Sequence, residues 1–301
     1  HPDDEDELKR LALQYRDRLE FALGRTCSVT WDAAPGARVA TRVATTWLPI
    51  SETPKTKAAS NAAVITDMRT LAATSSDELR AGLLPLVTGY RTWLDAQAAI
   101  AADLPPHLST IADEAIFEAR QVAARLADGI EFVATNDEAR RCFAFANTVM
   151  ADQRIRSQVA AKRAANPSLS IADAKASVDA DGPKAHSWYL FQLAFVLLQL
   201  PALTDPAADR RSNPDLAAVE LLFFPTGGGK TEAYLGLAAY AFAIRRRQGV
   251  VQSASGPLDG RLGLTVLMRY TLRLLTAQQF QRATTMVCAA ELERRRDPSV
   301  W

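Results

Sequence analysis

The sequence predicts an α/β domain over residues 184–301, the first part of a doubly wound parallel sheet, preceded by a mainly α-helical domain with a small β-hairpin over residues 1–183. Apolar residues at helical spacing fill most of the first part. The turn signal Ala34-Pro35-Gly36 separates two stretches of alternating Val, Thr and Trp. In the second part, two continuous apolar runs each lead into a helical segment, which is typical of buried parallel strands.

The N-terminal domain is predicted to open with a helix and a hairpin. Residues 3–7 form an acidic run, which we interpret as a solvated tail or a helix start. Apolar residues recur at helical spacing over residues 8–23, and Gly24 is expected to end that helix. The two strands of the hairpin are expected at residues 27–31 and 39–50.

Helices are expected from about Asn61 onward. The capping-box patterns Ser75-x-x-Glu78 and Thr135-x-x-Glu138 place helix starts near Ser76 and Asn136. Apolar and aromatic stripes at helical spacing are interpreted as the core of a helical bundle rather than as a binding cleft. The stripes comprise Leu83, Leu86, Tyr90 and Leu94, then Ile111, Ala115, Val122, Leu126 and Ile130, then Phe143, Phe145 and Met150.

The C-terminal domain follows a turn signal at residues 181–183. We expect helices at residues 187–200, 231–247 and 271–296, and buried strands at residues 219–224 and 264–268. A loop rich in Pro, Asp and Asn is expected at residues 201–214. Strand, loop, helix, strand and helix in this order open a doubly wound sheet.

Composition excludes some classes of protein and leaves others open. The longest apolar runs, residues 193–203 and 234–244, are too short to span a bilayer, so we expect no membrane segment. No secretion signal is visible, and the three cysteines form no C-x-x-C pair, which fits a reducing cytoplasm without zinc or disulfides. The net charge of +1 neither favours nor forbids a nucleic-acid partner. Because His1 is not a start methionine, we expect the chain to be a piece of a longer protein.

The most specific motif is a phosphate loop, Thr226-Gly227-Gly228-Gly229-Lys230-Thr231, between a predicted strand and a predicted helix. The glycines allow a tight turn with exposed N–H groups, and the helix dipole that starts there favours an anion. We expect Lys230 to reach the β- and γ-phosphates of ATP and the Thr231 hydroxyl to bind Mg²⁺. Glu232 is assigned no catalytic role, because an acid in a first helical turn is favourable by itself. The alternative is a glycine-rich turn with an incidental lysine.

The Pro-Thr-Gly-x-Gly-Lys-Thr form of this loop resembles motif I of superfamily-two helicases. The resemblance implies a RecA-like lobe, with a motif Ia after the second strand that binds a nucleic-acid backbone. Its candidate residues here are Arg269, Thr271, Arg273 and Gln278. Polar and cationic side chains at a helix start suit phosphate contacts. A plain helix cap followed by an amphipathic helix is the alternative.

An upstream segment is similar to the glutamine element with which such helicases bind adenine. It reads Trp188-Tyr189-Leu190-Phe191-Gln192. A glutamine amide can both donate to and accept from an adenine edge, so the resemblance implies an adenine contact for Gln192. A plain helix-surface glutamine is the alternative.

Two stretches together, residues 224–236 and 266–282, resemble the helicase subunit family of DISARM anti-phage systems, DrmA. The resemblance implies an ATP-dependent DNA-binding subunit that acts with a second subunit, DrmB, on phage DNA. Two alternatives stay open: another restriction- or repair-associated helicase acting on DNA or RNA, and a nucleotide-gated protein-docking switch without translocation.

Two parts of a complete helicase are not found in the sequence. No Asp-Glu pair, the acidic motif II, follows Thr231, and no second RecA-like lobe follows the first. Both lobes of a helicase hold ATP, so residues 1–301 alone are expected to bind nucleotide weakly and to hydrolyse little. The clusters Arg245–Arg247 and Arg294–Arg296 lie at predicted helix C-termini, where cations meet the dipole favourably, and a DNA-binding surface is their alternative.

Overall fold

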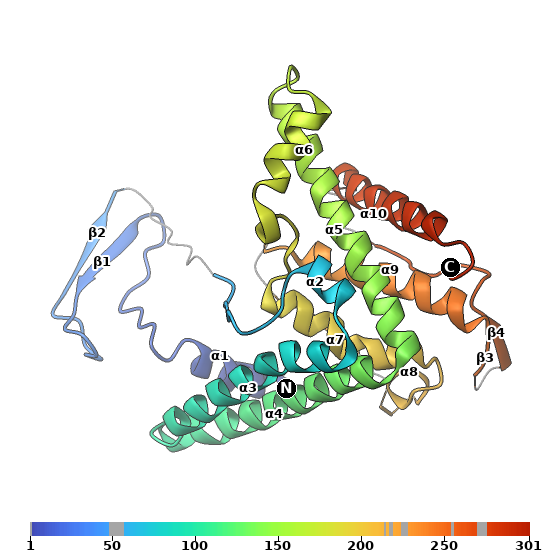
Figure 1. Ribbon diagram of the computed structural model, residues 1–301. Coiled ribbons are helices and arrows are strands. Elements are labelled where there is room, and N and C mark those ends of the chain that lie inside the picture. Colours follow the sequence, from blue (N-terminus) through green and yellow to red (C-terminus); the bar gives the residue numbers. More distant parts are fainter. Residues whose placement is uncertain are drawn as a thin grey trace. The chain divides into compact units, whose positions relative to one another are not determined.

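The computed structural model describes residues 2–47, 57–213, 215–216, 219–223, 228–253, 256–269 and 276–301. The described part is mainly α-helical and contains two short antiparallel hairpins (Figure 1). The chain divides into two compact units, His1–Lys57 with Thr92–Gln121, and Ala58–Arg91 with Val122–Trp301. The boundary predicted after residue 183 therefore falls inside the second unit.

The first unit holds the predicted hairpin, but its second strand begins at Arg42 rather than Val39 and ends at Thr46, and residues 48–50 of the predicted strand lie outside the described residues. It contains α1 (Pro2–Gln14), β1 (Ser28–Asp32), β2 (Arg42–Thr46), the end of α3 (Ser76–Ala101) and the start of α4 (Pro106–Thr135). Strands β1 and β2 pair antiparallel, with Ser28 opposite Thr46 and Asp32 opposite Arg42. The Thr41 hydroxyl donates to the Asp32 carbonyl across 3.0 Å and so supports the end of β1.

The first helix is shorter than predicted. α1 ends at Gln14, whereas helical spacing of apolar residues continues to Leu23. Leu8, Leu19 and Leu23 are all exposed, so little apolar burial supports a longer helix. A helix without a buried face gains little from periodicity alone, and this accounts for the early end.

The second unit carries the remaining elements. Its helices are α2 (Met68–Ala73), α5 (Asp137–Ala165), α6 (Ile171–Asp179), the 3₁₀ turn η1 (Gly182–His186), α7 (Leu190–Thr204), α8 (Asp209–Ser212), α9 (Lys230–Gln248) and α10 (Thr276–Arg296), with β3 (Val250–Ser253) and β4 (Gly256–Asp259) between α9 and α10. The predicted helix at residues 231–247 corresponds to α9 and is confirmed within one residue at each end. Strands β3 and β4 pair antiparallel and were not predicted.

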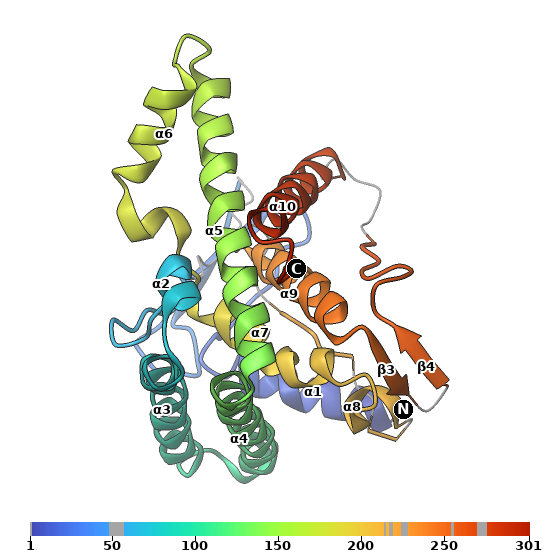
Figure 2. The same cartoon turned by 45° about the vertical axis from the view of Figure 1, so that its right-hand side comes forward.

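Helix α5 is the centre of the second unit. It packs against α2, α9 and α10, and α9 packs in turn against α7. Figures 1 and 2 both show α9 and α10 on the same side of α5. One core joins these helices through side chains that are almost fully buried: Met68, Phe143, Leu193, Tyr240 and Met286. The aromatic stripe of α5 is therefore core, as predicted.

Both predicted capping sites mark real helix starts. At the start of α3, Glu78 accepts from the backbone N–H of Ser75 across 3.2 Å and from its hydroxyl across 2.7 Å. At α5 the cap is Asn136 rather than Thr135, because the Asn136 side chain accepts from the Ala139 N–H across 2.9 Å. Glu138 does not take the capping role predicted for it. Its carboxylate accepts hydrogen bonds from Arg247 of α9 instead.

The predicted parallel sheet is wrong for the described residues. Residues 219–223 and 264–268 form no strand pairs, and the sheets of the described part are the two antiparallel hairpins. In the first segment alternate side chains are exposed, with Val219 97% and Phe223 86% exposed, whereas Glu220 and Leu222 are half-buried. In the second segment Val266 and Met268 pack on the core while Leu267 is exposed. An apolar run favours burial but does not specify a hydrogen-bonding neighbour, which a strand requires. Phe224, the last residue of the first run, lies outside the described residues.

Two further expectations concern cysteines and membranes. All three cysteines, Cys27, Cys142 and Cys288, are free thiols, in agreement with the predicted absence of a disulfide framework. Among the helices described, none has the length and hydropathy needed to cross a membrane.

Candidate nucleotide-binding site

The phosphate loop meets helix α9 at Gly229. Gly228 and Gly229 precede Lys230, the first residue of the helix, whereas Thr226 and Gly227 lie outside the described residues. Gly229 caps α9 with a φ of +89°, in the left-handed region that favours glycine. A Cβ at this position would lie 2.7 Å from Nε2 of Gln192. Both the backbone conformation and the close approach therefore require glycine here.

Helix α9 directs its N-terminus at the loop. Lys230 and Thr231 occupy its first two positions and are half-buried. The helix runs for 19 residues, so its dipole favours an anion at this end. Lysine and threonine side chains and the positive end of the helix dipole thus belong to one helix terminus. That set of groups fits the phosphates of a nucleotide and a Mg²⁺ ion bound through the Thr231 hydroxyl.

Gln192 lies directly against the loop. Its Nε2 donates to the Gly229 carbonyl across 2.6 Å, and its Oε1 accepts from the Tyr189 N–H across 2.8 Å. The side chain is 1% exposed, so Gln192 is not the helix-surface residue of the alternative interpretation. The structure brings Gln192 and the loop together, although the two are far apart in sequence. The adenine contact itself stays a prediction, since both ends of the amide are bonded to backbone here.

Glu232 and Arg282 form a second contact at the loop, which the sequence analysis missed. Arg282 of α10 lies 3.1 Å from Oε1 of Glu232, and the Glu232 side chain is 13% exposed. The other carboxylate oxygen, Oε2, is buried and has no hydrogen-bond partner among the described residues. It lies 3.5 Å from the position of a Cβ on Gly229. A negative charge therefore stands at the edge of the loop.

The back of α9 is fixed by a buried tryptophan. The indole Nε1 of Trp188 donates to Oδ1 of Asn147 on α5 across 2.8 Å. A Cβ on Gly236, in the second turn of α9, would lie 2.7 Å from the Trp188 ring. Trp188 therefore sets the distance between α9 and α5, and with it the position of the loop.

The predicted motif Ia residues are only partly described. Arg269 is exposed in the segment before α10, and Gln278 is exposed in the first turn of α10. Thr271 and Arg273 lie outside the described residues. The two described residues are available to a ligand, and their nucleic-acid role stays a prediction.

The arginine clusters bond within the chain. Arg245 donates to the carbonyls of Leu262 and Leu264 across 2.9 and 2.8 Å. Arg247 binds Glu138 with two nitrogens at 2.9 and 2.7 Å, and this hydrogen bonding holds the pKa of Glu138 below its ordinary value. In the second cluster, hydrogen bonds from Arg294 and Arg295 lower the pKa of Glu291 to about 2. Both clusters thus have partners within the chain, and the choice between a dipole role and a DNA-binding role stays a prediction.

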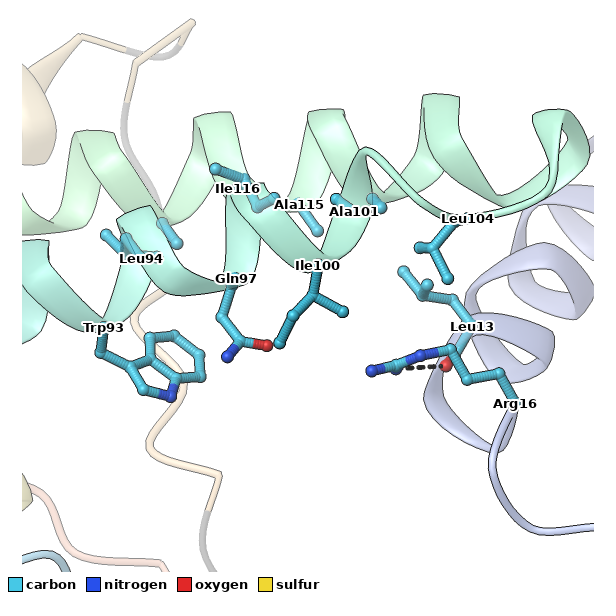
Figure 3. Close-up of a pocket in the computed structure, with 12 residues that line it drawn as sticks. Leu13, Arg16, Trp93, Leu94, Gln97, Ile100, Ala101, Leu104, Ala115 and Ile116 are labelled. Carbon is cyan, nitrogen blue, oxygen red and sulfur yellow. Dashed lines mark hydrogen bonds between the residues drawn. The ribbon is translucent and has the colours of Figure 1, made fainter. Parts of the chain in front are cut away.

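The first unit holds an apolar cavity of about 170 Å³ (Figure 3). Trp93, Ile100 and Leu104 line it together with Leu13 of α1. Arg16 at its edge donates to the Leu13 carbonyl across 3.0 Å, so its guanidinium already has a partner. None of the predicted site residues lines this cavity.

Comparison with known proteins finds a relative among anti-phage defence proteins. The chain is 37% identical over 187 residues, 61% of its length, to the "DISARM protein DrmA" of Bacillus paralicheniformis. This supports a DrmA-type assignment. No protein-family model matches the sequence. The match covers 15% of the DrmA relative, so this chain corresponds to a small part of that protein's length.

The site residues that sequence reasoning missed are those with distant partners. Glu232 follows the phosphate loop directly and was passed over because its position in the first helical turn already explains an acid. Arg282 lies at the end of the stretch that resembles DrmA, and no local pattern links it to Glu232. Among the described residues, no group of three His, Cys, Asp or Glu side chains is placed to hold a metal ion.

Proposed function

We propose that this chain binds ATP and Mg²⁺ at the N-terminus of α9, as part of an ATP-hydrolysing DNA translocase in an anti-phage defence system. The observation that carries the proposal is the left-handed backbone conformation of Gly229. This glycine lies immediately before Lys230 and Thr231, at the start of a long buried helix. The similarity to a DISARM protein supports the defence context.

The residues at this site have distinct roles in the proposal. Lys230 and the N–H groups of the first turn hold the β- and γ-phosphates, and the Thr231 hydroxyl holds the metal ion. Bound Mg²⁺ would neutralise charge that develops on the transferred phosphoryl group. Gln192 holds the loop through the Gly229 carbonyl. The helix that contains Gln192 packs on α9, so the loop rests on a rigid support.

The proposed nucleic-acid contact lies in the segment between residue 269 and α10. Arg269 and Gln278 are exposed on either side of residues 270–275, and Thr271 and Arg273 belong to the same proposed contact. Contacts of this kind bind the backbone of DNA and do not read its sequence. We further propose the DISARM subunit DrmB as the protein partner, and phage DNA as the target.

A nucleotide-gated docking switch is the second candidate. The packing of α5 on both α9 and α10 favours it, because a conformational change at the phosphate loop would act directly on the helices that pack around α5. In this case ATP would control assembly with a partner protein, and DNA would not stimulate hydrolysis.

One experiment separates the two candidates. ATP hydrolysis by the natural full-length protein is measured with and without double-stranded DNA, single-stranded DNA and RNA. The translocase predicts stimulation by nucleic acid that is lost in Lys230→Ala and kept in the control Lys184→Ala, an exposed lysine outside the loop. Hydrolysis or ATP binding that ignores every nucleic acid, but changes binding of DrmB, would favour the switch.

A further inference from the structure

We propose that Arg282 is a positioning residue of the nucleotide site, which acts by neutralising Glu232 beside the phosphate loop. The inference rests on the proposed function, since it assigns a further residue to the same site. It concerns an ion pair between α9 and α10 that joins residues 50 positions apart.

The carboxylate of Glu232 faces the loop. Glu232 lies in the first turn of α9, and its N–H donates to the Gly229 carbonyl across 3.3 Å. Its Oε2 lies 3.5 Å from the position that a Cβ on Gly229 would take. Any anion held by the loop is therefore close to a buried negative charge. Two like charges in a partly buried site repel each other more strongly than they would in water.

Arg282 compensates this charge. Its Nη1 is 3.1 Å from Oε1 of Glu232, and the pair is mostly removed from solvent, with side chains 33% and 13% exposed. Because Oε2 has no hydrogen-bond partner among the described residues, the arginine supplies the main compensation seen for the carboxylate. Without Arg282, an unpaired carboxylate would stand beside the bound phosphates.

The position of Arg282 is fixed by the core. Met286 and Ala289, on the next turns of α10, are buried against the other helices of the second unit. Arg282 itself is less exposed than its neighbours Gln278 and Phe280 on the same helix. Packing of α10 thus fixes the backbone that presents Arg282 to α9.

The experiment measures how nucleotide affinity depends on phosphate charge. Binding of ATP, ADP and adenosine to the natural full-length protein is measured by displacement of a fluorescent ATP analogue. In Arg282→Gln we expect the affinity for ATP to fall about tenfold, the effect of one uncompensated charge near the phosphates. ADP should lose less, and adenosine should bind as in the wild type. A loss of folding or shape would instead weaken all three ligands alike.

Matched variants make the test specific. The double variant Glu232→Gln with Arg282→Gln removes both charges and should restore ATP affinity to within about twofold of the wild type. Arg282→Lys should keep most of the affinity. Arg295→Gln, the same change on the same helix at a residue paired with Glu291, should have no effect. If Arg282→Gln does not fold, the ATP affinity of Glu232→Gln tests the inference by itself. This variant should bind ATP at least as tightly as the wild type.

Two outcomes would overturn the inference while leaving the proposed function intact. The first is wild-type ATP affinity in Arg282→Gln in a protein whose binding is lost in Lys230→Ala. The second is weaker ATP binding in Glu232→Gln. If the wild-type protein binds no ATP, the proposed function itself is wrong, and the inference about Arg282 is wrong with it.

Discussion

Gln192 donates a hydrogen bond from Nε2 to the carbonyl oxygen of Gly229 across 2.6 Å, and so ties the first turn of α7 to the phosphate loop. Its Oε1 accepts from the N–H of Tyr189, so the amide bridges two backbone segments. The glutamine side chain is almost fully buried, so this bond between the helix and the loop is shielded from water. The conformation of the loop thus depends on a residue 37 positions upstream.

Gln192→Ala is expected to weaken ATP binding. The change leaves the Gly229 carbonyl and the Tyr189 N–H without their partner, which costs about 1–3 kcal/mol in the loop conformation. The dissociation constant for ATP, measured by titration calorimetry, should rise by about tenfold or more. Gln158→Ala is the control, because Gln158 also donates to a backbone carbonyl, that of Ala185 across 2.7 Å, but away from the loop. Equal ATP affinities in the two variants would show that Gln192 does not hold the loop.

Gly229→Ala should abolish nucleotide binding while the chain stays folded. The substitution places a Cβ 2.7 Å from Gln192 Nε2 and also imposes a left-handed conformation on alanine. Gly182→Ala is the matched control: Gly182 also has positive φ, but open space surrounds its Cβ position. Both variants should lose about 1–2 kcal/mol of stability for the conformation alone, and Gly182→Ala should bind ATP normally. Loss of ATP binding in both would mean that general destabilisation is the cause.

Gly236→Ala should destabilise the second unit. Its new methyl group would lie 2.7 Å from the ring of Trp188, which the hydrogen bond to Asn147 holds in place. We expect a loss of about 1–3 kcal/mol in the free energy of unfolding, measured in urea, as for other overpacked cores. Gly89→Ala in α3 has only an ordinary contact at 3.4 Å, and should gain about 0.5–1 kcal/mol from helix propensity. Equal stabilities of the two variants would contradict the close packing of Trp188 on α9.

The Glu138–Arg247 pair should make stability depend on acid pH. Hydrogen bonds from Arg247 hold the pKa of Glu138 below the ordinary value of 4.5, so the folded state binds the proton less readily than the unfolded chain. The stabilising contribution is therefore complete above the ordinary pKa and is lost as the pH falls through the lower, folded pKa.

Glu138→Gln removes this contribution at neutral pH. The difference in unfolding free energy between the wild type and Glu138→Gln should be largest near neutral pH, and should shrink from about pH 5 downward. Urea titrations at a series of pH values measure it. Glu291→Gln, whose carboxylate pairs within α10 only, provides a comparison on an exposed helix face. A difference that stays constant down to low pH would rule out the ion pair as its source.

Several features that depend on local sequence could be predicted, although the local β3–β4 hairpin was not. The starts of α3 and α5 follow from side-chain caps within four residues, and α9 begins where glycine gives way to residues that favour a helix. The β1–β2 hairpin follows from alternation on either side of a Pro-Gly turn. Each of these signals is contained in a few neighbouring residues.

Features that depend on residues far apart in the chain could not be predicted from the sequence. The apolar runs at residues 219–223 and 264–268 carry no information about which segment would pair with them, and the predicted sheet does not form among the described residues. At the site, Gln192 was singled out from the sequence, but its bond to Gly229 was not, and the Glu232–Arg282 pair was missed altogether. Their juxtaposition results from the packing of α7 and α10 against the other helices of the second unit, which no local pattern specifies.

The central claim is that ATP binds at the N-terminus of α9, and titration of Mg²⁺-ATP into wild-type and Lys230→Ala protein tests it most directly. The expected result is a single site whose affinity falls at least about tenfold in Lys230→Ala, with Lys184→Ala unchanged. Removal of Mg²⁺ should weaken binding in the wild type, because the proposed Thr231 contact needs the metal. Equal affinity of wild type and Lys230→Ala, or no binding of ATP by the natural full-length protein, would contradict the assignment of the phosphate loop.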